Sequence, residues 1–314
     1  MVGSAVCRSL IRHGYGKSSC NGELQRPSRK ELNLLDATAV DKWFESHKPT
    51  VVILAAAKVG GIYANNKYPA QFLLENIKIQ SNIIESAWKN GVRRLLFLGS
   101  SCIYPKDCPQ PISEEYLLSG DLESTNQWYA IAKIAGLKLC EALRVQYGFD
   151  AITLMPTNLY GPGDNYHPEN SHVLPALIRR IYSAKETGAK SVTCWGTGNP
   201  RREFLFVDDL AEACIYVLEN WDPMLPKSPT NQSGGLLTYL NVGTGQDITI
   251  RELAETVAST LHYEGSICWD HTKPDGTFRK QLNVNRINSL GWTARTTLHQ
   301  GLKNTITDFI ETSI

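Results

Sequence analysis

The sequence has 314 residues, with 32 basic and 31 acidic side chains and a formal net charge of +1 at pH 7. Its 42% hydrophobic and 20% charged residues are ordinary for a globular protein, and the chain is long enough to bury one large core or two moderate ones. This charge balance excludes a polyelectrolyte character, so we expect neither nucleic acid nor a membrane surface as a partner.

The cysteines and histidines show no spacing typical of a disulfide framework or a metal site. The eight cysteines form no CxxC pair, and the histidines are scattered. We therefore expect reduced thiols, a cytoplasmic location and no bound metal. No leader segment opens the sequence, and no apolar stretch reaches the roughly 18 residues that a membrane helix needs.

Residues 1–13 (MVGSAVCRSLIRH) have apolar side chains at helical spacing, which predicts an amphipathic helix with Gly3 in its first turn. In a dinucleotide-binding fold, an apolar strand and a glycine-rich turn precede such a helix. The sequence as written contains no counterpart of that strand. We expect the chain to be less stable, and to bind a dinucleotide more weakly, than a version that carries one.

Residues 14–30 are rich in glycine and end in three basic side chains, Arg26, Arg29 and Lys30, with no clear apolar strand before them. An acidic residue in this region suits the ribose 2′-OH of NAD, whereas an arginine suits the 2′-phosphate of NADP. A solvated basic loop is an equally good interpretation of the composition alone.

Two uninterrupted apolar runs predict buried parallel strands. The first, VVILAAA at residues 51–57, is followed by the turn KVGG at residues 58–61, whose glycines allow a cofactor or substrate to approach the backbone. The second, LLFLGSSCIYP at residues 95–105, ends in Gly99, Ser100, Ser101 and Cys102. We expect these residues at the carboxyl edge of the sheet, where ligands bind. Residues 72–88 form a long amphipathic helix between the two runs.

Tyr129 and Lys133 lie four residues apart in TNQWYAIAKIAG, so both project from one face of the predicted helix after Thr125. A nearby ammonium group is expected to lower the pKa of the tyrosine. Together with a serine hydroxyl that can bind a carbonyl, this set suits hydride transfer at a C–O carbon. The alternative is a chance pair on a surface helix.

Residues 151–159 (AITLMPTNL) predict the next strand, after which the sequence becomes polar and irregular. Asn170 or Ser171 is expected to cap a helix with His172 in its first turn, although a surface histidine fits the same pattern. Residues 195–204 (WGTGNPRREF) place an aromatic ring near Arg201 and Arg202, which suits a nucleotide diphosphate. Further expected elements are helices at 208–219 and 250–261, a strand at 240–242 and an inserted loop at 220–235.

The segments GSSCIYP, AAAKVGG, MPTNLYGP, ENSHVLPALIRR and KPDGTFRK, with the serine upstream of the Tyr-Lys pair, resemble the extended short-chain dehydrogenase/reductase superfamily. Within it the chain is similar, over essentially its whole length, to the GDP-L-fucose synthase family. The resemblance implies an α/β fold: a doubly wound, mostly parallel, Rossmann-like sheet with its first strand lacking, and a smaller α+β substrate domain. It implies an NADP-binding domain at residues 1–162 and a mainly substrate-binding domain at residues 163–314, with some segments returning to the first. It also implies a homodimer built on a four-helix bundle.

The resemblance further implies NADPH-dependent conversion of GDP-4-keto-6-deoxy-D-mannose to GDP-L-fucose, by 3,5-epimerisation and then 4-keto reduction. Cys102 and His172 match the acid/base pair, and Ser100, Tyr129 and Lys133 match the reduction set. The implied cofactor-binding residues are Gly3, Arg29, Asn33, Leu34, Ala56, Leu98, Gly99, Ser100, Ser101, Lys133, Pro156, Asn158, Leu159 and His172. The implied substrate-binding residues are Arg180, Trp195, Arg202, Lys273 and Asp275.

Three other functions fit parts of the sequence. A nucleotide-sugar 4,6-dehydratase would need a carboxylic acid one or two residues after Ser100, where Ser101 and Cys102 stand. A UDP-hexose 4-epimerase needs no relay thiol. A catalytically inactive nucleotide-sugar-binding protein is the third alternative. Phe206 departs from the family pattern, since related sequences usually carry histidine there, which leaves the polarity near the cleft open.

Overall fold

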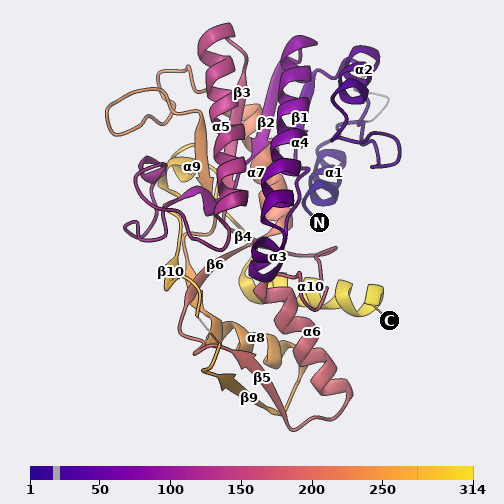
Figure 1. The fold of residues 1–314 in the computed structure, drawn as a ribbon, viewed down its shortest axis with the longest axis vertical. Coiled ribbons are helices and arrows are strands. Elements are labelled where there is room, and N and C mark those ends of the chain that lie inside the picture. The colour runs from indigo at the N-terminus through magenta and orange to yellow at the C-terminus, as the bar shows by residue number, and fades with distance from the viewer. Residues whose placement is uncertain (17–21, 274, 314) are drawn as a thin grey trace.

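The computed structural model describes residues 1–16, 22–273 and 275–313 (Figure 1). Cys20, one of the eight cysteines, and Pro274, the second residue of the KPDGTFRK segment, lie outside the described residues. The chain forms an upper lobe around a parallel sheet and a lower lobe around smaller sheets (Figure 1).

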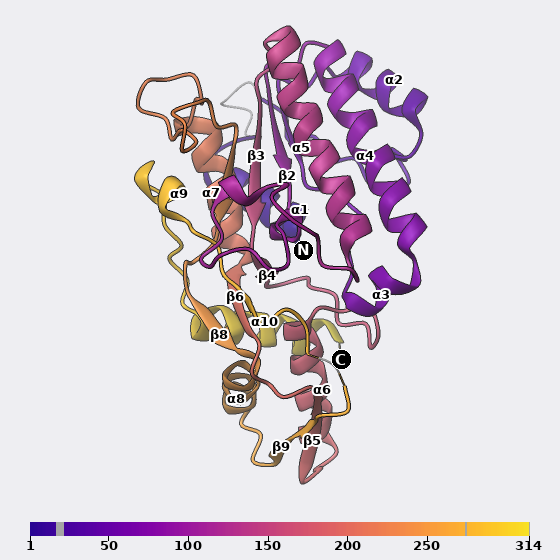
Figure 2. The same ribbon diagram turned by 60° about the vertical axis from the view of Figure 1, so that its left-hand side comes forward.

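The main sheet has four parallel strands in the order β1-β2-β3-β7. They are β1 (Val51–Leu54), β2 (Arg94–Leu98), β3 (Ala151–Pro156) and β7 (Tyr239–Val242). The two central strands are almost entirely buried, as expected where helices cover both faces of a parallel sheet. The carboxyl ends of all four strands meet at one edge, which faces the lower lobe (Figure 2).

Helices cover both faces of this sheet. In Figure 2, α4 (Pro69–Lys89) and α5 (Gln127–Tyr147) lie on one side of β2 and β3, and α7 (Val207–Asn220) lies on the other. The helix α2 (Ala37–His47) packs beside α4, and α1 (Val2–Arg12) packs on α7, where Arg8 Nη2 lies 2.6 Å from Asp208 Oδ1. This arrangement confirms the predicted doubly wound, mostly parallel α/β fold.

The lower lobe contains two small sheets and three helices. Parallel pairing joins β4 (Asn158–Tyr160), β6 (Arg201–Phe206) and β10 (Arg279–Lys280), and β8 (Asp247–Thr249) pairs antiparallel with β6. A second sheet pairs β5 (Ser191–Trp195) with β9 (Ser266–Asp270). The helices of this lobe are α6 (Val173–Glu186), α8 (Ile250–Leu261) and α10 (Leu298–Ser313). Short helices elsewhere are α3 (Ile62–Lys67), η2 (Ser101–Ile103), η3 (Glu114–Tyr116) and α9 (Asn285–Ser289).

The chain passes between the lobes more than once. Their buried apolar side chains form two separate clusters, one around the main sheet and one between α6, α8 and α10. Both α7 and β7 follow the first lower-lobe strands in sequence, yet they pack in the upper lobe. The expected return of later segments to the first lobe is therefore observed.

Three expectations about local structure were wrong. The run at residues 51–57 is not a fully buried strand: β1 ends at Leu54 and lies at the sheet edge, so Val51 is 39% exposed. The run at residues 151–159 forms two strands, β3 and β4, because the chain leaves one sheet for the other at Thr157. Neither Asn170 nor Ser171 caps α6; His172 occupies the N-cap position and makes no side-chain capping bond.

A glycine lets α4 and α5 approach each other. A Cβ added at Gly136 would lie 2.6 Å from Phe97 Cζ and 2.8 Å from Gln80 Cδ. Gln80 is itself buried and donates a hydrogen bond to the Ala132 carbonyl of α5. The interface between these helices has no space for a methyl group.

We predict that Gly136→Ala lowers the free energy of unfolding by about 1–3 kcal/mol, because overpacking outweighs the better helix propensity of alanine. Thermal melts would measure the change. Gly3→Ala is the matched control, since no atom lies within 4 Å of a Cβ at that helical glycine. Equal melting temperatures for both variants would contradict the prediction.

Candidate active site

The loop after β2 places three candidate residues at the carboxyl edge of the main sheet. Ser100 caps the short helix η2, and its Oγ accepts a hydrogen bond from the Cys102 backbone N–H at 3.2 Å. A Cβ at Gly99 would lie only 2.7 Å from Met155 Sδ, so this position requires glycine. The backbone therefore turns tightly against β3 and presents Ser100 and Cys102 beyond the strand end.

Helix α5 brings Tyr129 and Lys133 to the same loop. Lys133 is only 4% exposed, and its Nζ donates a hydrogen bond to the Leu98 carbonyl at 2.8 Å. The same nitrogen lies 5.9 Å from the centre of the Tyr129 ring and 4.7 Å from that of Phe97. The predicted grouping of Ser100, Tyr129 and Lys133 thus has a structural basis in the packing of α5 on the end of β2.

The expected effect of Lys133 on the tyrosine was wrong for this structure. Burial raises the pKa of Tyr129, and the nearby Cys102 raises it further, while a hydrogen bond with Ser100 opposes both effects. Burial also lowers the pKa of Lys133 to about 7. The ammonium is committed to a backbone carbonyl and to an aromatic face, so its charge does not overcome the desolvation of the phenol.

Cys102 lies among polar groups from three separate parts of the chain, two of which hydrogen-bond its sulfur. Asn126 Nδ2, at the N-cap of α5, lies 3.5 Å from the sulfur, and Lys280 Nζ, on β10, lies 3.4 Å from it. Arg202 on β6 is close enough to interact electrostatically with the same sulfur. Sequence reasoning missed Asn126 and Lys280. Asn126 stands three residues before Tyr129, but no spacing rule connects Cys102 with a lysine 178 positions later.

His172 lies at the N-cap position of α6, in the lower lobe. The residue has exposed surface, but its ring is crowded by protein atoms; this crowding and the positive charge of Lys280 both lower the pKa of His172. Because Lys280 contacts Cys102 and also influences His172, the structure brings the two predicted acid/base residues to one neighbourhood.

Four of the five predicted substrate residues lie near one another: Trp195 ends β5, Arg202 is on β6, and Lys273 and Asp275 follow β9. Lys273 Nζ lies 5.7 Å from the centre of the exposed Trp195 ring. Asp275 accepts hydrogen bonds from the Thr197 backbone and hydroxyl at 2.9 and 2.6 Å, and it also faces Arg202. Arg180 stands apart from this group on α6, where it donates to the Thr193 carbonyl at 2.9 Å.

Most of the predicted cofactor residues belong to the upper lobe, whereas Asn158, Leu159 and His172 belong to β4 and the start of α6 in the lower lobe. Asn33 and Leu34 stand in the turn before α2, and the Leu34 carbonyl accepts a hydrogen bond from Asn82 of α4 at 2.9 Å. Arg29 is exposed and makes no ion pair among the described residues. Ala56 follows β1 and is exposed. The remaining positions fall in the first turn of α1, at the end of β2 and in the residues after it, at the end of β3, and in β4: Gly3, Leu98, Gly99, Ser100, Ser101, Pro156, Asn158 and Leu159.

Asn158 helps to hold the crossing between the lobes. Its Nδ2 donates to the Glu203 carbonyl at 2.8 Å, and β4 pairs with β6 in the register Asn158 to Phe204. Phe206, the position that departs from the family pattern, is 5% exposed and packs edge-on against Tyr160. It belongs to the lower core, so it does not supply a polar group to the cleft.

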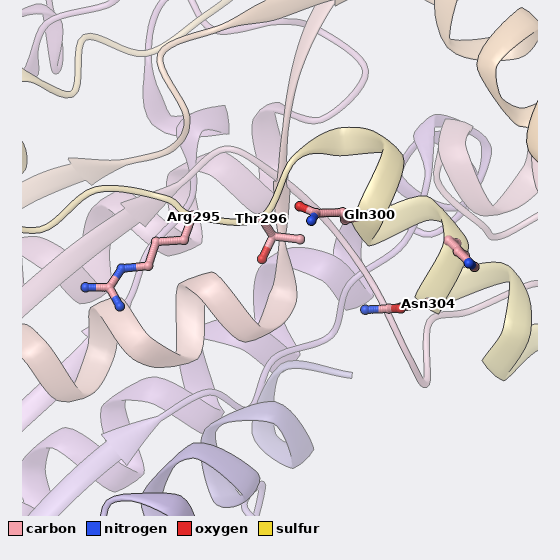
Figure 3. A pocket seen from close by; sticks show the side chains of 5 residues that line it. Arg295, Thr296, Gln300 and Asn304 are labelled. Carbon is pink, nitrogen blue, oxygen red and sulfur yellow. The ribbon is translucent and has the colours of Figure 1, made fainter.

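A pocket elsewhere in the lower lobe contains none of the predicted site residues. It is lined by Arg295, Thr296, Gln300, Lys303 and Asn304 near the start of α10 (Figure 3). Its exposed basic and amide side chains suggest no chemistry, and we assign it no function. Across the described ranges, no group of three or more His, Cys, Asp or Glu residues could hold a metal ion. No helix in these ranges is long and apolar enough to cross a membrane.

Comparisons with known proteins agree with the motif resemblance. The model of the NAD dependent epimerase/dehydratase family matches residues 1–231. GDP-L-fucose synthase 1 of Arabidopsis thaliana is 54% identical over 305 residues, which cover 97% of this chain and 88% of that protein. GDP-L-fucose synthase of Escherichia coli (strain K12) is 52% identical over 311 residues, which cover 99% of this chain and 94% of that protein.

Among solved structures, a GDP-L-fucose synthetase from Naegleria fowleri bound to NADP superposes with a TM-score of 0.84 at 27% identity, covering 99% of this chain and 91% of that one. Sequence motifs, strand order and overall structure therefore point to the same group of enzymes. The chain belongs to the NAD dependent epimerase/dehydratase family.

Proposed function

We propose that the chain converts GDP-4-keto-6-deoxy-D-mannose to GDP-L-fucose with NADPH, by epimerisation at C3 and C5 followed by reduction at C4. The observation that carries this proposal is the meeting of two residue sets at one strand end. Ser100, Tyr129 and Lys133 suit carbonyl reduction, and the Cys102 thiol with His172 suits proton transfer at carbon. A reductase without epimerase activity would have no need for the second set.

The chain's residues fit NADPH at two places. The exposed and unpaired Arg29 can receive the 2′-phosphate, for which its guanidinium is well suited. Lys133, the Gly99 turn and the ends of β3 and β4 can hold the nicotinamide ribose and ring beside Ser100. When bound there, NADPH supplies the hydride for C4.

The GDP part of the substrate fits the polar face of the lower lobe. Arg202 can neutralise the diphosphate, because it lies at the site and makes no short ion pair among the described residues. Trp195 offers an exposed aromatic plane, held beside Lys273. Asp275 and Arg180 complete the proposed binding set, Asp275 through the loop that it ties to Thr197.

Epimerisation uses the acidity that a 4-keto group gives to the protons on C3 and C5. Cys102 removes a ring proton, and the electron pair moves onto the keto oxygen. His172 then returns a proton to the opposite face of the same carbon. The lowered pKa of His172 makes its imidazolium a stronger acid, although less of it is protonated at neutral pH. Solvent restores both groups before the second carbon reacts.

Reduction uses the upper residue set. Ser100 hydrogen-bonds the C4 carbonyl, and Tyr129 donates its proton to the oxygen as negative charge develops there. The hydrogen bond from Lys133 to the Leu98 carbonyl fixes the position of Tyr129 relative to the end of β2. The product is the C4 alcohol, GDP-L-fucose.

We also propose that residues 1–162 form the cofactor domain and that residues 163–314 form most of the substrate domain, with α7 and β7 returning to the first. The two apolar clusters support this division. The seven described cysteines are all free, which supports a cytoplasmic location.

A homodimer through α4 and α5 is part of the proposal. These helices lie side by side on the surface of the upper lobe (Figures 1 and 2) and carry exposed Leu74, Ile131 and Val145. Large apolar side chains on adjacent helices favour burial against another copy of the same surface.

We predict that Tyr129→Phe lowers the rate of reduction by about 10²–10⁴-fold, because it deletes the proton donor and keeps the ring. Deuterium uptake at C3 and C5 should continue, since Cys102 and His172 remain. Incubation with GDP-4-keto-6-deoxymannose and NADPH, with product identification, measures both steps. Normal NADPH oxidation by this variant would refute the role of Tyr129.

We predict that Cys102→Ser suppresses deuterium uptake at C3 and C5 by about 10²–10⁴-fold and leaves NADPH binding intact. A serine hydroxyl has no accessible anion near neutral pH, whereas a thiol does. Exchange in heavy water is followed by NMR, and NADPH binding by fluorescence titration. Exchange at the original rate would assign the base to another residue.

We predict that Leu74→Glu shifts the protein from dimer to monomer, because it places charges on the apolar contact. Sedimentation velocity at several concentrations measures the change. Leu225→Glu is the control, since Leu225 is similarly exposed, at 56% against 53%, but lies in the loop at residues 220–235. A monomeric parent protein, or an unchanged dimer in Leu74→Glu, would exclude this interface.

A further inference from the structure

The pairing of β10 determines where the side chain of Lys280, the lysine beside Cys102, points. Lys280 and Arg279 form β10, which pairs parallel with β6 so that Lys280 stands next to Arg202. Neighbouring side chains of a strand point to opposite faces. Arg279 accordingly turns away to Asp247, where its Nε lies 2.5 Å from Oδ2, and Lys280 turns to the cleft, where its Nζ lies 3.4 Å from Cys102 Sγ.

The charge of Lys280 has no carboxylate partner. Among the described residues, its side chain makes no ion pair, and the Cys102 sulfur is its hydrogen-bond partner. The acidic groups nearby, Glu123 and Asp275, interact with Arg202. A lysine ammonium beside a sulfur, with the nearby carboxylates turned to another cation, is an arrangement that can hold a thiolate once it forms.

Other groups also face Cys102. Arg202 approaches from β6, Asn126 and Tyr129 from α5, and Ser100 from the same loop. Of these, Arg202 is the other cation, and its Nη1 already donates to the Arg201 carbonyl at 2.8 Å. His172 faces Lys280 from α6, and Cys108, a second thiol, is influenced by Lys280 from the loop after η2. Lys280 is therefore the cation that contacts the Cys102 sulfur directly.

We propose that Lys280 is a positioning residue for Cys102: its ammonium holds the sulfur as a thiolate, aimed into the cleft, for removal of ring protons. This inference rests on the proposed function for its role in epimerisation. In the step itself, the ring C–H bond breaks, an S–H bond forms on Cys102, and the released electron pair becomes the enolate. Lys280 keeps its protons throughout, and solvent then takes the proton from the sulfur.

The first test needs no substrate. The rate at which iodoacetamide alkylates Cys102 is measured from pH 6 to pH 9 by mass spectrometry of the modified peptide. In Lys280→Met, which keeps the length and removes the charge, we expect alkylation at pH 7 to fall about tenfold, and the profile to move to higher pH by about one unit. Lys280→Arg keeps the charge and should stay within about threefold of the parent protein.

Two controls separate this effect from general changes. Lys106→Met alters an exposed lysine in the loop that also carries Cys102. It should leave the pH profile of Cys102 alkylation unchanged. Cys268 is an exposed thiol on β9, and its alkylation within each sample corrects for reagent and folding. Circular dichroism checks each fold, and Lys280→Gln replaces Lys280→Met if the latter does not fold.

The second test measures deuterium uptake at C3 and C5 in the same variants. Lys280→Met should lose exchange at pH 7 by about tenfold and regain it as the pH rises, whereas a structural defect would lower exchange equally at every pH. An unchanged alkylation profile in Lys280→Met would overturn the inference. So would a loss of exchange that no increase in pH restores.

The two proposals fail in different ways. If the parent protein catalyses no exchange on GDP-4-keto-6-deoxymannose, the proposed function is wrong, but a shifted alkylation profile in Lys280→Met still supports the link between Lys280 and the sulfur. If the parent exchanges normally and the alkylation profile does not shift, the function stands and the role of Lys280 is rejected.

Discussion

The hydrogen bond from Lys133 to the Leu98 carbonyl fixes the geometry on which the rest of the site depends. It joins the middle of α5 to the last residue of β2 at 2.8 Å, inside a nearly closed environment. Since Tyr129 lies one helical turn before Lys133, and Ser100 lies two residues after Leu98, this bond sets the position of the proton donor relative to the serine. Gly136 reinforces it by letting α5 pack closely on α4.

A second constraint connects the two lobes. Glu203 on β6 is fully buried and accepts hydrogen bonds from the backbone N–H groups of Leu282 and Gly245, at 2.7 and 2.8 Å. Burial raises the pKa of Glu203, and the hydrogen bonds from the Leu282 and Gly245 backbone oppose this rise. The segment that carries Lys280 is thereby held against β6. The role proposed for Lys280 beside Cys102 depends on this contact, although Glu203 is not itself part of the site.

The sequence predicted the elements whose signal is local. The helix at residues 250–261 was predicted with its observed bounds, and the strand before Ser100 and the helix of Tyr129 and Lys133 were also correct, because apolar periodicity reports which face is buried. The predictions failed where the position of neighbouring strands determines burial or the end of a strand. Val51 is exposed because β1 has a strand on one side only, and Thr157 ends β3 because the chain changes sheets.

The same distinction between local and long-range signals applies to the residues of the candidate site. Ser100, Tyr129 and Lys133 come from adjacent elements, and the family resemblance, together with the local motifs, grouped them. Lys280 was missed because it reaches Cys102 through the pairing of β10 with β6, a contact that no local pattern encodes. The expected lowering of the Tyr129 pKa failed for a related reason. The sequence places Lys133 next to Tyr129 correctly, but the burial of both side chains depends on the whole fold.

The pKa directions of Tyr129 and Lys133 have a consistent chemical meaning. A phenol whose pKa is raised keeps its proton at neutral pH, which agrees with the role of proton donor proposed for Tyr129. Burial lowers the pKa of Lys133 from 10.5 to about 7, so between these two values the unfolded chain binds a proton that the folded chain does not. Stability from this group therefore falls as the pH decreases from 10.5 to 7, and the loss is complete below 7. Burial of Lys133 therefore lowers the free energy of unfolding at neutral pH. In return, its hydrogen bond to Leu98 fixes a donor beside the end of β2.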